Sequence, residues 1–172
     1  AVPVDSEDIT HSGTGRFTWL MMRPMSLYES GESSGEVSLK DLFNKPDKIT
    51  GISEHNIDDL SFLICRGGWP HAVGMKEKAA LSQAEDYYDA VVKSDINRAD
   101  GVNKNPERVK RLMRSFARNQ GAQIGYTTLR DDIQANDTGS LNEDTVASYV
   151  NALKKIFVIE DMPAWNPNLR SK

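Results

Sequence analysis

The residues best suited to bind a charged ligand are arginines between positions 106 and 118. Arg111, Arg114 and Arg118 follow one another at i, i+3 and i+7, so a helix would carry all three on one face. Such a face can bind the phosphates of DNA or RNA. It can equally meet an acidic partner domain, or remain solvated. The sequence leaves these three alternatives open.

The helix expected after Asn142 is the candidate for reading bases. Its first turn holds Glu143 and Asp144, whose carboxylates would repel phosphate where base contacts are normally made. Its outward face is small and polar, which is moderately suited to a groove of DNA. On this face, Ser148 and Lys155 are the residues we expect to contact nucleic acid if the module binds it.

Arg16 is a separate candidate for phosphate binding. It follows a glycine-rich stretch and opens an apolar segment that we expect to be a strand. An arginine at a strand end can reach a phosphate or a partner's carboxylate. A surface or structural salt bridge is the alternative.

The string Arg66-Gly67-Gly68-Trp69-Pro70 is the most unusual in the chain. Two glycines allow a positive φ or a close approach to another surface. Trp69 and Pro70 then form a stiff corner. We expect Gly67, Gly68 and Trp69 to make a structural turn between helices, with a ligand-contacting loop as the alternative.

The sequence offers no catalytic or metal-binding motif. It lacks G-x-x-x-x-G-K-[ST], so it cannot cradle nucleotide phosphates as a P-loop does. The histidines and the cysteine show no metal-ligand spacing: His11, His55, His71 and Cys65. Adjacent carboxylates such as Asp131 and Asp132 point in different directions on a helix, so we expect a solvated face there. We therefore predict no catalytic residue, no metal site and no cofactor in this chain.

Composition limits the function classes further. The chain has 172 residues, enough for one domain or two small ones, and its net charge is only −4. Nucleic-acid binding would therefore require a local basic patch. No run approaches the roughly 18 apolar residues that span a membrane, and we expect no secretory signal from the sequence pattern. The single cysteine fits a reducing compartment, so we expect a cytoplasmic protein.

The apolar pattern predicts a mainly α protein with a short N-terminal strand. The segment 17–22 is apolar and stops at Pro24, which favours a buried strand. Helices are expected over 38–43, 56–66 and 76–95. The polar stretch 97–105 is the expected boundary between two parts, 1–100 and 101–172.

The second part has the element order of a winged helix. Asn105 and Pro106 start one helix, a short helix follows over 128–135, and Asn142 caps a third. Val158 and Ile159 suggest a strand after it. Three helices followed by a strand is the order of a helix-turn-helix module with a wing.

Several strings, in order and spacing, resemble one prokaryotic AAA+-type P-loop ATPase family, whose members fuse an ATPase core to a C-terminal domain of unknown function. These strings are 15–17 with 23–29, then 66–70, 87–96, 144–153 and 160–165. The resemblance implies that 1–100 is the end of an ATPase core with a lid-like helical subdomain. It also implies a parent protein with its Walker motifs upstream, where ATP and Mg would bind, and a further α/β domain downstream. Only Arg16 could then contribute to a nucleotide site from this chain.

Two functions are therefore expected. The first is a regulatory or coupling region of such an ATPase, unable to hydrolyse ATP alone, with the upstream core and downstream domain as partners. The abrupt ends at Ala1 and Lys172 favour an excerpt of this kind. The second is a nucleic-acid-binding winged-helix module with DNA as partner. No membrane contact is expected under either hypothesis.

Overall fold

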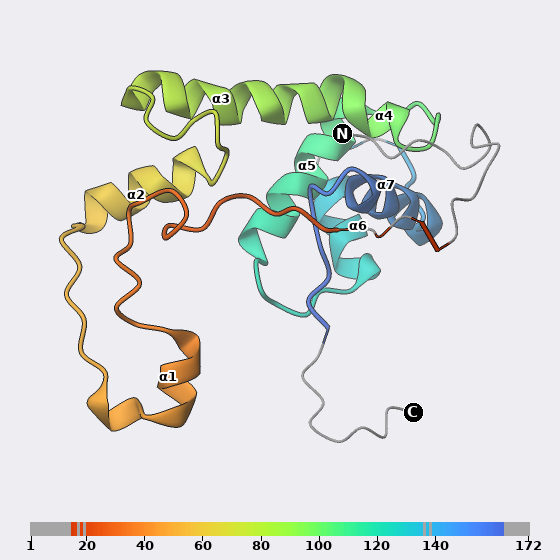
Figure 1. Ribbon diagram of the computed structural model, residues 1–172. Helices are drawn as coiled ribbons and strands as arrows, with labels where there is room; N and C mark the ends of the chain where they lie inside the picture. Colours follow the sequence, from red (N-terminus) through yellow and green to blue (C-terminus); the bar gives the residue numbers. More distant parts are fainter. Residues whose placement is uncertain (1–14, 17, 19, 136, 138, 164–172) are drawn as a thin grey trace. The chain divides into compact units, whose positions relative to one another are not determined.

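The computed structural model describes residues 15, 16, 18, 20–135, 137 and 139–163. The described chain is mainly helical, which confirms the predicted class (Figure 1). It divides into two compact units, represented in the described part by residues 15–88 and 89–163. No helix among the described residues is long and apolar enough to cross a membrane. The predicted division into 1–100 and 101–172 stays a prediction.

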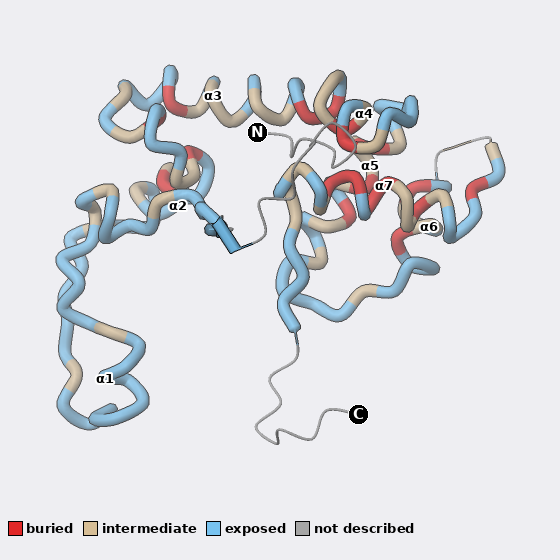
Figure 2. Tube along the Cα trace, turned by 45° about the vertical axis from the view of Figure 1, so that its right-hand side comes forward, coloured by how far each residue is buried: buried red, intermediate tan, exposed pale blue. Residues whose placement is uncertain are grey.

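The unit of residues 15–88 holds α1 (Leu39–Asn44), the 3-10 helix η2 (Pro46–Lys48), α2 (Ile57–Arg66) and most of α3 (Glu77–Ala90). Helix α2 begins with a capping box, in which the Asn56 side chain accepts from the Asp59 amide and the Asp59 carboxylate accepts from the Asn56 amide. The residues around α1 are almost all exposed (Figure 2). This unit therefore has a small core.

The predicted N-terminal strand is wrong for the residues that can be judged. Residues 18 and 20–22 have no regular structure, and Leu20 and Met22 are each about nine-tenths exposed. Residues 17 and 19 lie outside the described part. A strand needs a neighbour to complete its backbone hydrogen bonds, and the described chain contains no strand to supply one. The apolar pattern alone could not reveal that.

The unit of residues 89–163 has the larger core. It contains the end of α3, the π-helix η3 (Val91–Asp95), α4 (Ile96–Arg98), α5 (Pro106–Arg118), α6 (Tyr126–Gln134) and α7 (Glu143–Lys155). Helix α6 packs against both α5 and α7, and these three helices carry half of the buried residues of the described chain (Figure 2). The core side chains, each less than a tenth exposed, include Val91, Val92, Ile96, Val109, Leu112, Leu129, Ile133, Val146, Tyr149, Val150 and Leu153.

The predicted wing strand at Val158 and Ile159 is also absent from the described chain. These residues follow a Schellman motif that ends α7: Phe157 has a φ of 60°, its amide donates to Lys154 O at 3.0 Å, and the Val158 amide donates to Leu153 O at 3.0 Å. The Val158 amide, which a wing strand would need for pairing, is thus used to close the helix. Three helices in the predicted order remain, without the wing.

Candidate functional site

The arginine face of α5 is folded against acidic groups of its own unit. Arg111 Nη1 donates to Ile133 O at 3.1 Å and lies 3.9 Å from Asp137 Oδ2. Arg118 Nη2 pairs with Asp132 Oδ2 at 3.0 Å. Two of the three predicted phosphate-binding arginines therefore already have anionic partners at the end of α6 or just beyond it.

Asp137 is the centre of the first of these contacts. Arg108 Nε donates to Asp137 Oδ2 at 2.6 Å, and the Gly139 amide donates to Asp137 Oδ1 at 3.1 Å. The hydrogen bond from Arg108, followed by the one from the Gly139 amide, holds the pKa of Asp137 below its ordinary value. This carboxylate therefore stays ionised beside Arg111, and it offsets part of the positive charge of α5.

Asp132 is held from two sides. The fully buried Ser115 donates its hydroxyl to Asp132 Oδ2 at 2.5 Å, in addition to the pair that Asp132 makes with Arg118. The Ser115 hydroxyl lies on the core-facing side of α5, so this bond anchors α6 onto α5. Asp132 is therefore a structural residue as well as a counter-charge, and it is not a solvated carboxylate as the sequence suggested.

Arg114 differs from its two neighbours. It is exposed, and none of the ion pairs found among the described residues includes it. Its charge does act on Glu107, whose pKa is lowered first by a hydrogen bond from Lys110 and more weakly by Arg111 and Arg114. Of the three arginines predicted to form a phosphate-binding face, Arg114 is the one that makes no ion pair with the described residues.

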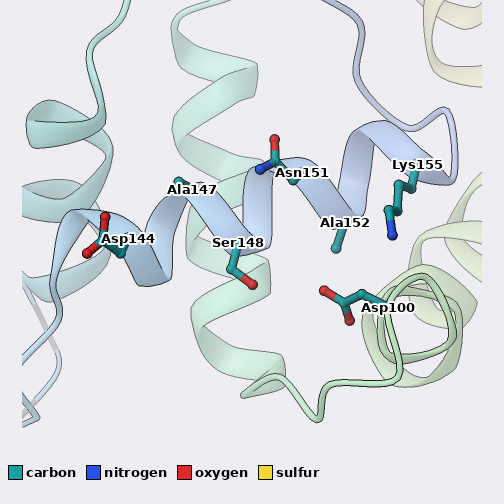
Figure 3. A pocket seen from close by; sticks show the side chains of 7 residues that line it. All are labelled: Asp100, Asp144, Ala147, Ser148, Asn151, Ala152 and Lys155. Carbon is teal, nitrogen blue, oxygen red and sulfur yellow. The ribbon is translucent and has the colours of Figure 1, made fainter.

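The outward face of α7 forms one wall of an open groove of about 420 Å³ (Figure 3). Six of its lining residues come from α7 and one from the loop after α4: Asp144, Ala147, Ser148, Asn151, Ala152, Lys155 and Asp100. The groove therefore includes both residues of this helix that the sequence singled out, Ser148 and Lys155. Two carboxylates accompany the single lysine, so the groove is not a positively charged surface.

A buried ion pair fixes the Asp100 side of the groove. Lys104, only 2% exposed, places its Nζ 2.5 and 2.6 Å from the two carboxylate oxygens of Asp100. Burial raises the pKa of Asp100, but hydrogen bonds from Lys104 and the Val102 amide outweigh it and lower the pKa overall. Lys155 Nζ donates to Ala99 O at 3.3 Å on the same side. This edge of the groove is therefore held by hydrogen bonds within the unit.

The predicted turn of Gly67, Gly68 and Trp69 lies after α2. Gly67 has a φ of 70°, a conformation that favours glycine. A Cβ on Gly68 would lie 2.2 Å from Met25 O, because the Met25 amide donates to Gly68 O at 2.7 Å. The Trp69 ring lies 4.7 Å, centre to centre, from the ring of Tyr87. Each of the three residues therefore has a structural role in this turn.

Next to this turn, Arg66 is 4% exposed and forms an ion pair with Glu32, in which Nη2 lies 3.2 Å from Oε2. This pair connects α2 to a segment about 34 residues earlier. The candidate nucleotide-contacting residue, Arg16, is exposed in a turn after Gly15.

Sequence reasoning missed the acidic partners of α5. Asp132 lies 17 residues from Ser115, and Asp137 lies 29 residues from Arg108, so helical spacing could not pair them. One signal was present: Ser115 falls three residues after Leu112 on the apolar stripe of α5, and a buried hydroxyl needs a partner. In the described part of the chain, no three histidine, cysteine or carboxylate side chains gather as a metal site.

The comparisons place the chain in a family. The family model described as domain of unknown function (DUF8612) matches residues 57–172, and the chain belongs to this family. The matched range begins at α2 and includes the α5 arginines and the α7 groove. No curated protein and no solved structure matches the chain.

Proposed function

We propose that this chain is a coupling region that binds other protein surfaces and has no catalytic activity of its own. One observation carries the proposal: Arg111 and Arg118, two of the three arginines predicted to bind phosphate, have partners within their own unit. A carboxylate that is already ion-paired to an arginine must be displaced before a phosphate can take its place. This favours a protein-facing role over a DNA-facing one.

The unit of residues 15–88 supports a partner surface. It exposes many large apolar side chains, among them Leu20, Met22, Phe43, Ile52 and Ile64, each at least 80% exposed. Surface of this kind costs free energy in water, and soluble domains usually cover it with a partner. An adjacent protein domain would provide that cover.

The parent that we propose is an AAA+-type P-loop ATPase, on the resemblance described above. Its upstream core would bind ATP and Mg, and the helices of this chain would pass the nucleotide state on to a downstream domain. Arg16 is exposed, as a residue that reaches towards a nucleotide of the core would have to be. In this proposal the chain works in the cytoplasm and its partners are the flanking domains of the parent.

Nucleic-acid binding is the second candidate, and it depends on Arg114. This exposed arginine, with the order of α5, α6 and α7, keeps a helix-turn-helix role open to test. Ser148 and Lys155 on α7 would then approach the bases, although Asp144 at the same face opposes phosphate.

Binding of fluorescent duplex DNA at about 50 and 200 mM salt separates the two functions. Three arginines on phosphates would weaken binding about 40-fold across this range, since the affinity falls with a slope of about 0.9 per phosphate contact. Contact through Arg114 alone would give about a 3-fold change. We expect no binding tighter than about 100 µM, the weak end of non-specific affinity. Tight binding with the steep salt dependence would overturn the coupling proposal. Measurable ATP turnover by the pure chain would overturn it as well.

A further inference from the structure

The α7 groove has a symmetry that the functions proposed so far do not use. The helix contributes six lining residues, and they form three pairs centred on the point between Tyr149 and Val150. The outer pair has opposite charges, Asp144 and Lys155. The next pair consists of two alanines, Ala147 and Ala152, and the inner pair is Ser148 and Asn151.

These residues also lie on one stripe of the helix. Asp144, Ser148, Asn151 and Lys155 follow one another at spacings of four, three and four residues, which is the spacing of a seam between two packed helices. The two charged ends are about 16 Å apart along the axis. Figure 3 labels the six lining residues of α7, from Asp144 at one end to Lys155 at the other.

From this pattern we propose that the α7 groove is a self-association surface, which binds α7 of a second copy of this chain in an antiparallel, twofold-symmetric arrangement. In a twofold interface each contact occurs twice, with the two residues exchanged. Asp144 would meet Lys155 of the other copy, and Ser148 would lie in one layer with Asn151 of the other copy. Both of these pairs match at once.

Charge complementarity selects this occupant over others. A partner helix must be basic where α7 is acidic, acidic where α7 is basic, and small in between. The reversed α7 helix has this order. Asp100, the remaining lining carboxylate, does not oppose the approach, because both its oxygens are bonded to Lys104 Nζ.

The small residues favour a close approach. Ala147 has no side chain beyond Cβ, and the neighbouring Ser148 is small, so the two helix axes can come within about 8 Å. Ser148 and Asn151 carry a hydroxyl and an amide, which can donate and accept across the axis. Ala152 is 1% exposed and lies beneath the groove, so the partner would contact the residues above it.

The surface is small, so the dimer should be weak. A standard protein–protein interface buries about 800 Å² on each partner, and a single face of a 13-residue helix buries less than this. We expect a dissociation constant of roughly 10–500 µM. This inference goes beyond the coupling role and does not depend on the parent being an ATPase.

Charge reversal tests the arrangement. Sedimentation equilibrium of the full chain, over about 10–500 µM, should show a monomer–dimer equilibrium. Asp144→Lys or Lys155→Glu alone places like charges opposite each other twice, and each should weaken the dimer about 10-fold or more. Mixing the two single variants should restore a heterodimer, because the introduced lysine of one chain then opposes the introduced glutamate of the other, while the unchanged Asp144 and Lys155 oppose each other. The double variant should restore the homodimer.

Matched controls carry the same charge changes outside the groove. Lys154→Glu loses only an exposed ion pair with Asp161, and Glu143→Lys loses surface contacts with Thr127 and Arg130. Both should dimerise like the wild type. Circular dichroism verifies that each variant is folded.

Three results would overturn the proposal. The wild type could remain monomeric over the whole range. Its dimer could be unaffected by reversal at Asp144 or Lys155. The mixture of single variants and the double variant could both fail to recover dimer formation, which would assign the groove to a different partner. The dimer should also weaken as salt rises, and a salt-independent dimer would contradict the charge pairing.

Discussion

Replacing Asp132 should destabilise the unit of residues 89–163 by about 2 kcal/mol. Ser115 is fully buried, and its hydroxyl donates to Asp132 at 2.5 Å. With Asp132→Ala the hydroxyl loses this acceptor inside the protein, which costs about 1–3 kcal/mol. Rotation of the hydroxyl to a carbonyl of its own helix would give the lower end of that range. The lost pair with Arg118, which is 60% exposed, adds at most about 0.5 kcal/mol.

A double-mutant cycle isolates the buried bond. Ser115→Ala removes the donor and leaves Asp132 with Arg118 and water, so it should cost about 1 kcal/mol. The double variant leaves no buried group without a partner, and should cost about 2 kcal/mol, less than the sum of the single changes by about 1 kcal/mol. As a control, Asp131→Ala removes a carboxylate that is 63% exposed and should change stability by less than about 0.5 kcal/mol.

Urea unfolding followed by circular dichroism at several temperatures measures these free energies of unfolding. Each 1 kcal/mol should lower the melting temperature of a unit of this size by roughly 4–8 °C. Costs of the two single variants that add within about 0.3 kcal/mol would refute the argument that Asp132 and Ser115 act as a pair. An Asp132→Ala variant as stable as Asp131→Ala would refute it too.

Three further changes test other parts of the structure. Gly68→Ala should destabilise the unit of residues 15–88 by about 2 kcal/mol or more, because its Cβ would lie 2.2 Å from a backbone oxygen, and calorimetry would show the loss. Glu32→Ala should cost about 3 kcal/mol by leaving the buried Arg66 unpaired, and hydrogen exchange should accelerate in α2; unchanged exchange would contradict this. Asp137 has a lowered pKa, so its pairing with Arg108 contributes stability above the ordinary aspartate pKa of about 3.9 and loses it as the pH falls through the lower folded value. The stability difference between wild type and Asp137→Asn should therefore be constant from about pH 7 to 5 and shrink below about pH 4, and a difference that already shrinks near neutral pH would contradict this assignment.

The helices of the C-terminal unit could be predicted because their signals are local. Asn105 and Asn142 cap α5 and α7 as expected, since each carries a side-chain oxygen that accepts from amides of the first turn. Pro106 occupies the first turn of α5, where its missing amide costs nothing. Helix α6 begins two residues earlier than expected, within the usual variation of helix ends.

The strands could not be predicted from the same kind of signal. An apolar segment such as 20–22 is compatible with a strand, but a strand also requires a partner elsewhere in the chain. Val158 had the composition of a strand residue, yet the Schellman motif after α7 uses its amide. Whether the backbone of such a segment pairs as a strand or closes a helix depends on the fold and not on the local sequence.

The candidate site likewise has one part that could be predicted from the sequence and one part that could not. Helical spacing brought Arg111, Arg114 and Arg118 to one face of α5, but their partners lie on a different helix or beyond it. Charge patterns along one helix are visible in sequence, whereas pairing between helices depends on packing. The sequence therefore located the arginines and could not show that two of them are already engaged.

Titration of fluorescent duplex DNA with the wild type and with the variant that combines Arg111→Ala, Arg114→Ala and Arg118→Ala tests the central claim most directly. At about 50 mM salt, where phosphate contacts are strongest, the coupling account predicts weak binding that differs by less than about 3-fold between the two proteins. Tight binding by the wild type that is lost in the variant, and that weakens about 40-fold between about 50 and 200 mM salt, would contradict it and make α5 a nucleic-acid-binding surface.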